Sequence, residues 1–103
     1  MARSFLVALL AVIATSGHGY ADVMHGKQLS EALCSQCHAI VAGRPSPNPK
    51  APTFARSAAD PSITVYSLRA FLRTSHETMP NIIVKPDDAD DIAEYLLSLA
   101  PKR

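Results

Sequence analysis

The sequence predicts an all-α domain, and two observations predict it. Three stretches, at about 23–34, 65–74 and 86–99, carry apolar residues three and four positions apart, which is the spacing of an amphipathic helix. The rest of the chain lacks the alternation of apolar and polar residues that a half-buried strand would show. We therefore expect a small helical fold without a sheet.

The first of these stretches has a glycine in its interior. Gly26, Leu29 and Leu33 recur on one face of the expected helix. Glycine costs a helix interior about 1 kcal/mol relative to alanine, so its presence needs a reason. We expect another helix to pass close to the backbone at Gly26.

The middle of the chain, 41–61, is predicted to be a loop. It contains prolines at positions 45, 47, 49, 52 and 61 and few apolar residues, and proline interrupts a regular helix. Because the segment lies inside one small domain, we expect it to wrap around that domain rather than to link two domains. Another loop is predicted at 76–85, where no periodicity is strong.

The two later helices have recognisable starts and stripes. Thr64 or Ser62 can cap the second helix, and Pro86 suits the first turn of the last one, with acidic residues following where the helix dipole favours them. The apolar stripe of the second helix consists of Val65, Leu68, Phe71 and Leu72. The stripe of the last helix consists of Ala89, Ile92, Tyr95, Leu96 and Leu99.

Residues 1–21 are predicted to be a signal peptide that is cleaved, which leaves one domain at 22–103. Arg3 precedes an unbroken apolar run at 5–14, and the small residues Gly19 and Ala21 stand where a signal peptidase reads the chain. The run is well short of the ~20 apolar residues that span a bilayer. An uncleaved membrane anchor is the alternative.

The charge balance argues against one class of partner. Lys and Arg number 10 and Asp and Glu number 9, and removal of Arg3 with the leader makes the balance even. A surface that binds phosphates normally shows a basic excess. No nucleic-acid partner is therefore expected.

Both cysteines of the chain lie in one pentapeptide, Cys34-Ser35-Gln36-Cys37-His38. Two thiols three residues apart can each add to one vinyl group of a haem, and the histidine that follows can bind the iron, so the pattern predicts one covalently attached haem c. A thiol redox pair, a structural zinc site and a plain disulfide are the alternatives. A thiol redox pair normally needs a βαβ setting, and a structural zinc site needs more ligands. The export signal, the histidine and the helical pattern favour haem.

A six-coordinate iron needs a second axial ligand from the other face of the ring. The candidates in 22–103 are Met24, His25, His76 and Met79. Met24 and His25 are too close to the cysteines in sequence to reach across the ring easily. We favour Met79, which is followed by Pro80 in a predicted loop, and keep His76 as its rival. A thioether ligand raises the reduction potential relative to two imidazoles.

At these residues the sequence resembles the class I c-type cytochromes, over nearly all of 22–103. The resemblance rests on Cys34-Ser-Gln-Cys37-His38, on Met79-Pro80, and on Ile92-Ala-Glu-Tyr95-Leu96 in the last helix. It implies the cytochrome c-like fold, with three to four helices wrapped around one covalently bound haem, and tight packing of Gly26 against Tyr95. It further implies that a loop proline, for which Pro52 is the candidate, accepts a hydrogen bond from the ligand histidine.

The resemblance also suggests that Tyr66 hydrogen-bonds the methionine sulfur or a haem propionate, although a core aromatic at this position is equally in keeping with its helix. The sequence lacks the lysine-rich face of the mitochondrial carrier, and Ser30 stands where an aromatic residue is frequent in the family. The first of these departures leaves the identity of the partners open.

The expected function is one-electron transfer in the periplasm. We expect an electron carrier rather than an enzyme, and we expect it to be a monomer. Its expected partners are redox proteins, such as a dehydrogenase, an oxidase or another cytochrome, and they include membrane-bound complexes. Docking is expected on the surface around Gln36, Ala39 and the Met79 loop. The alternatives are a haem enzyme or gas or peroxide sensor with an open sixth position, and a dedicated subunit of a dehydrogenase or oxidase complex.

Overall fold

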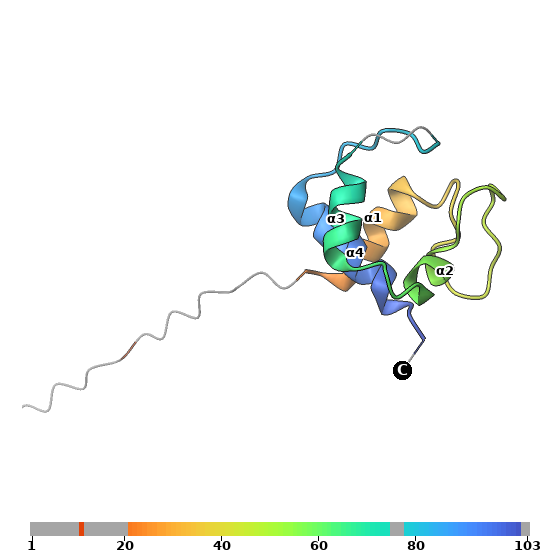
Figure 1. Ribbon diagram of the computed structural model, residues 1–103. Coiled ribbons are helices and arrows are strands. Elements are labelled where there is room, and N and C mark those ends of the chain that lie inside the picture. The colour runs from red at the N-terminus through yellow and green to blue at the C-terminus, as the bar shows by residue number, and fades with distance from the viewer. Residues whose placement is uncertain (1–10, 12–20, 75–77, 102–103) are drawn as a thin grey trace, which may run out of the picture.

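A computed structural model of the chain describes residue 11 and residues 21–74 and 78–101. Within these residues it contains four α-helices and no strand, which confirms the predicted all-α class: α1 (Val23–Leu33), α2 (Phe54–Ala59), α3 (Val65–Leu72) and α4 (Pro86–Ser98). Helix α4 lies at the centre and contacts each of the other three helices (Figure 1). Apart from Ala11 and Ala21, the predicted signal peptide lies outside the described residues, and so does His76.

Helix α1 starts where the sequence predicts and ends one residue earlier. The Asp22 side chain caps it by accepting a 3.0 Å hydrogen bond from the His25 backbone N–H. Its buried face differs from the expected stripe, since Gly26 and Ser30 are buried while Leu33 is exposed. The reason is that small residues four positions apart let α4 approach the backbone of α1.

The crossing of α1 and α4 confirms the close approach expected at Gly26. A methyl group built on Gly26 would overlap the Asp91 carbonyl oxygen, would lie 2.5 Å from the Asp91 carbonyl carbon, and would lie 2.9 Å from the Tyr95 Cβ. No side chain fits in that space. The buried stripe of α4 consists of Ala89, Ile92, Ala93, Tyr95 and Leu96.

Helix α2 lies inside 41–61, so the prediction of an unbroken loop there is wrong. The prolines of this segment stand before or after the helix and none lies within it. Thr53 caps α2, because its side chain accepts a 3.1 Å hydrogen bond from the Arg56 N–H. Phe54 and Ala58 are buried and hold α2 in the core.

Helix α3 is capped by Thr64, one of the two predicted caps, in a reciprocal capping box with Ser67. None of its residues is fully buried. Arg69 Nε lies 2.5 Å from Asp90 Oδ1 of α4, which joins the two helices by an ion pair. Residues 78–85 then lead to α4 without regular structure, as expected.

In the described part of the chain, none of the helices has the length and apolar character needed to cross a membrane. The core cluster is formed by Cys34, Ile40, Phe54, Ala58, Tyr95 and Leu96. The first cysteine of the pentapeptide is thus part of the core, between the end of α1 and the last turns of α4.

Candidate functional site

The pentapeptide forms a tight turn at the end of α1. Cys34 is the C-terminal cap of the helix, and its carbonyl accepts hydrogen bonds from the N–H groups of Cys37, at 3.2 Å, and His38, at 2.9 Å. The turn therefore fixes the two cysteines and the histidine relative to one another. No disulfide joins Cys34 to Cys37, so the structure does not contain the disulfide that was one alternative.

The two thiols have different surroundings. Cys34 is buried, and this burial raises the pKa of its thiol to about 11, with the nearby Ser30 hydroxyl acting in the opposite direction. Cys37 is half-buried. A buried neutral thiol is a poor partner for a thiolate-binding metal, because the thiolate is the ligand form. These surroundings suit thioether bonds, which leave no charge on the sulfur.

The His38 ring is held in one orientation by a backbone carbonyl. Its Nδ1 lies 2.7 Å from the Pro52 carbonyl oxygen. A carbonyl can only accept, so Nδ1 must carry the proton and the lone pair is left on Nε2. This is the arrangement in which protein histidines bind metals, with the second nitrogen oriented by a carbonyl or carboxylate.

Phe54 and Tyr95 support this histidine from the core. The Phe54 ring is tilted against the His38 ring, with centroids 5.8 Å apart, and against the Tyr95 ring at 6.5 Å. The Phe54 N–H donates a 2.9 Å hydrogen bond to the Ala39 carbonyl, and the Tyr95 hydroxyl donates a 2.6 Å hydrogen bond to the Ile40 carbonyl. The backbone directly after His38 is thus tied to α2 and α4.

The proline-rich segment is also tied to the pentapeptide. The Asn48 N–H donates to the Cys37 carbonyl at 3.1 Å, and the Ser46 hydroxyl accepts from the Ala39 N–H at 3.0 Å. Sequence reasoning missed Phe54, Ser46 and Asn48. The capping Thr53 directly after Pro52 could have indicated a helix start at Phe54.

The remaining predicted residues lie elsewhere in the fold. Met79 is half-buried in the segment between α3 and α4. Tyr66 is 76% exposed on α3, with the Arg69 guanidinium carbon 5.6 Å from its ring centroid, so it is not a core aromatic. Ala39 is buried and cannot belong to a docking surface. His25 Nδ1 faces Asp91 Oδ2 of α4 at 2.7 Å.

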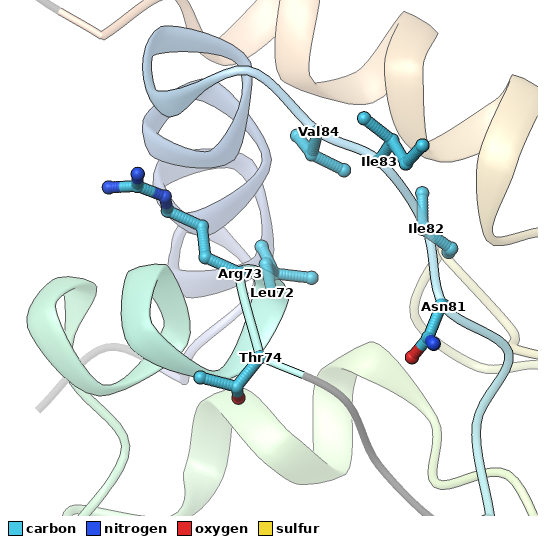
Figure 2. Close-up of a pocket in the computed structure, with 7 residues that line it drawn as sticks. All are labelled: Leu72, Arg73, Thr74, Asn81, Ile82, Ile83 and Val84. Carbon is cyan, nitrogen blue, oxygen red and sulfur yellow. The ribbon is translucent and has the colours of Figure 1, made fainter.

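A cavity of about 280 Å³ lies between the end of α3 and the segment that leads to α4 (Figure 2). The lining residues are Leu72, Arg73, Thr74, Asn81, Ile82, Ile83 and Val84. Ile83 is fully exposed and Phe71 is 46% exposed. In Figure 1 the C-terminal ends of α1 and α3 lie at the same end of the molecule. The pentapeptide begins at the end of α1, and Leu72, Arg73 and Thr74 at the end of α3 belong to the lining of the cavity.

These observations fit a haem. The donor set offers two cysteine thiols and one imidazole whose Nε2 carries the lone pair, which are the groups that hold haem c. Apolar side chains exposed on α3 and on 78–85 fit a large apolar ring. A zinc site would need further thiolate or imidazole ligands next to the pentapeptide, and the chain has no other cysteine.

Comparison with known proteins agrees with this interpretation. The family profile described as Cytochrome c matches residues 23–100. The chain is 34% identical over 99 residues to the protein named cytochrome c-552 from Bradyrhizobium diazoefficiens, an alignment that covers 96% of this chain and 95% of that protein. No solved structure gives a significant match. The chain therefore belongs to the cytochrome c family, whose members carry covalently attached haem c, one group being typical of a domain this small.

Proposed function

We propose that this cytochrome is an exported one-electron carrier whose haem is attached through Cys34 and Cys37 and ligated by His38 and Met79. Family membership supports a monohaem electron-transfer protein. The observation that carries the proposed ligation is the 2.7 Å hydrogen bond between His38 Nδ1 and the Pro52 carbonyl, because it directs Nε2 to be the metal-binding nitrogen.

Each residue has a defined part in this proposal. The thiols of Cys34 and Cys37 each add S–H across one vinyl group, so that two thioether bonds form and nothing is released. His38 and Met79 would be the two residues that hold the iron, so that the protein itself would supply both ligands and a substrate would have none to replace. When bound, the haem supplies an iron that gains and loses one electron. Pro52, Phe54 and Tyr95 keep His38 in the same orientation in both charge states, which lowers the reorganisation that electron transfer requires.

Several features support Met79 over its competitors. It lies in the segment 78–85, of which the residues Asn81 to Val84 line the cavity beside α3. His25 is at the other end of α1 from the cysteines, where it pairs with Asp91. Met24 is exposed in the same first turn. His76 lies outside the described residues and is the rival that experiment must test.

The absorption spectrum of the ferric protein tests the ligation. We expect the weak band at the red end of the spectrum that reports sulfur bound to iron, and we expect Met79→Ala to abolish it and to allow carbon monoxide to bind the ferrous iron. Met24→Ala is the matched control and should leave the band unchanged. A wild-type protein without this band, or with high-spin iron that binds carbon monoxide readily, would support the enzyme or sensor instead.

The covalent attachment and the export are tested together by mass. A chain that begins at Asp22 and carries one haem is expected after expression with its own leader, together with a pyridine haemochrome spectrum typical of two thioether bonds. Cys34→Ala and Cys37→Ala should each shift that spectrum toward one thioether. A colourless protein with both thiols free would exclude the proposal.

Tyr66 remains a predicted hydrogen-bond donor to the methionine sulfur or to a propionate. Tyr66 is exposed, and Arg69 lies over its ring. Tyr66→Phe should shift the reduction potential without loss of the red band if the hydrogen bond exists.

The proposed partners are redox proteins of the periplasm or of the adjacent membrane. The protein would bind them as a monomer, through the surface that includes Gln36 and the Met79 segment.

A further inference from the structure

The Asp91 side chain on α4 holds the start of α1 with both of its oxygens. Oδ1 accepts a 2.7 Å hydrogen bond from the Asp22 backbone N–H, and Oδ2 lies 2.7 Å from His25 Nδ1. The Asp91 side chain is only 14% exposed. These contacts join residues that are 66 and 69 positions apart, and the cysteines, His38 and Met79 take no part in them.

The surroundings of Asp91 carry an excess of negative charge. Asp88 Oδ1 lies 4.0 Å from His25 Nδ1, and the Asp22 carboxylate accepts the hydrogen bond from the His25 N–H. Among the residues that the structure describes, Asp22, Asp88 and Asp91 thus surround one imidazole, which carries at most one positive charge. A second cation placed at the Asp22 nitrogen would come closer to balancing them.

We propose that Asp91 is the binding site for the amino terminus of the mature chain, which cleavage between Ala21 and Asp22 creates. The inference rests on the proposed export, because the leader peptidase makes that end. Hydrolysis adds one water across the Ala21–Asp22 peptide bond. The carbonyl leaves as the carboxylate of the leader, and the Asp22 nitrogen becomes an ammonium group.

The nitrogen is already in place before cleavage, so processing changes its charge and not its position. An amide N–H offers one donor and no charge, whereas an ammonium offers three donors and a full charge, which strengthens the hydrogen bond to a carboxylate. A free ammonium at the first turn of α1 would otherwise be disfavoured by the positive end of the helix dipole. Asp91 offsets this repulsion and at the same time fastens α1 to α4.

The test uses the haem-loaded protein produced with its own leader. The pKa of the Asp22 amine is measured by trace acetylation at a series of pH values, with mass spectrometry of the N-terminal peptide. We expect a value above the ordinary α-amine range of about 7.7–8.0. Asp91→Asn should return it to that range, whereas Asp87→Asn, which removes an exposed carboxylate of the same helix, should leave it raised.

A second variant keeps every side chain and moves only the ammonium. One alanine inserted between Ala21 and Asp22, with cleavage retained after Ala21, restores an amide at Asp22 and places the new amine one residue further out. It should show an ordinary amine pKa and a melting temperature lower by a few degrees. This variant decides the question even if Asp91→Asn does not fold.

The outcomes separate this proposal from the export on which it rests. A mature mass that does not begin at Asp22 would overturn the predicted cleavage site and this binding site together. A chain that begins at Asp22, with an amine pKa in the ordinary range that Asp91→Asn does not change, would overturn the binding site alone. The haem attachment and the electron-transfer function would be untouched by that second result.

Discussion

The crossing of α1 and α4 and the region formed by α3 with residues 78–85 are built in opposite ways. At the crossing, Gly26 touches the backbone of α4, and Ser30 has 0% of its surface exposed. The Ser30 hydroxyl donates a 2.7 Å hydrogen bond to the Gly26 carbonyl, so even the polar group there is satisfied. On α3 no residue is fully buried, and the segment that follows includes the fully exposed Ile83.

This difference indicates two sources of stability. Packing of polypeptide on polypeptide holds α1 on α4. Leu68 packs α3 against the edge of the core cluster, and capping by Thr64 and the ion pair between Arg69 and Asp90 add to this contact. The exposed apolar side chain of Ile83, in the segment 78–85, suits contact with an apolar ring. In a chain of the cytochrome c family, such a ring is the haem. Substitutions at the crossing should therefore affect the whole domain, and those on α3 should act locally.

The largest effect is expected at the closest contact. Gly26→Val would force side-chain atoms into the Asp91 carbonyl group and the Tyr95 Cβ, and we expect a loss of about 3 kcal/mol or more in the free energy of unfolding. Denaturant unfolding of the haem-loaded protein measures it. Gln28→Val, on the exposed side of α1, is the control and should cost only about 0.5 kcal/mol through helix propensity. Similar losses for both variants would mean that the crossing is not tight.

The same two regions show what the sequence could and could not reveal. Gly26 was identifiable because a helix glycine is costly and needs a neighbour. Ser30 was not, because a buried serine has no apolar periodicity and its hydrogen bond is made within its own helix. As a result, Gly26, Leu29 and Leu33 were predicted to form the buried face of α1, whereas Leu33 is exposed in the structure.

The segment at 41–61 shows another limit. Its prolines predicted a loop, yet none of them lies between 53 and 60, where Thr53 caps a short helix. The pentapeptide was recognisable from residue types alone. The tilted contacts of Phe54 with His38 and Tyr95 were not, because they depend on three segments far apart in the chain.

A smaller but still global effect is expected at Tyr95, whose Cβ lies at the crossing and whose hydroxyl reaches Ile40. Tyr95→Phe removes the hydroxyl that donates to the Ile40 carbonyl and leaves that buried acceptor without its partner. We expect a loss of about 1–2 kcal/mol in the free energy of unfolding. Ser98→Ala removes a hydrogen bond near the exposed end of α4 and should lower the free energy of unfolding by only a few tenths of the loss expected for Tyr95→Phe. Equal losses would show that the Ile40 carbonyl finds a substitute donor.

A smaller and local effect is expected at the N-terminal cap of α3. Thr64→Ala removes the side chain that accepts the Ser67 N–H and should cost about 1 kcal/mol. Hydrogen exchange should show faster opening in α3, with α1 and the buried half of α4 unchanged. If protection falls equally in α1, the two regions unfold as one unit and the distinction drawn above is wrong.

The smallest effect concerns pH at the outer edge of the crossing. The hydrogen bond from His25 to Asp91, aided by the nearby charges of Asp91, Asp88 and Asp22, raises the pKa of His25 above its usual value, although desolvation acts against this. A group whose pKa is raised on folding stabilises the native state fully below its unfolded pKa of about 6.5 and loses that contribution as the pH rises through the folded value. Melting temperatures of wild type and His25→Asn should therefore differ most at pH 6 or below and converge at higher pH.

The contacts between His25 and Asp91 also determine how large the pH-dependent stabilisation is and which variant is its control. The contribution is small because the imidazole is half-exposed and solvent screens the pair. In a protein that already carries Asp91→Asn, the further change His25→Asn should no longer alter the melting temperature in a pH-dependent way, because the carboxylate that favours the imidazolium is gone. A gap between wild type and His25→Asn that widens with rising pH would show instead that His25 stabilises the protein in its neutral form.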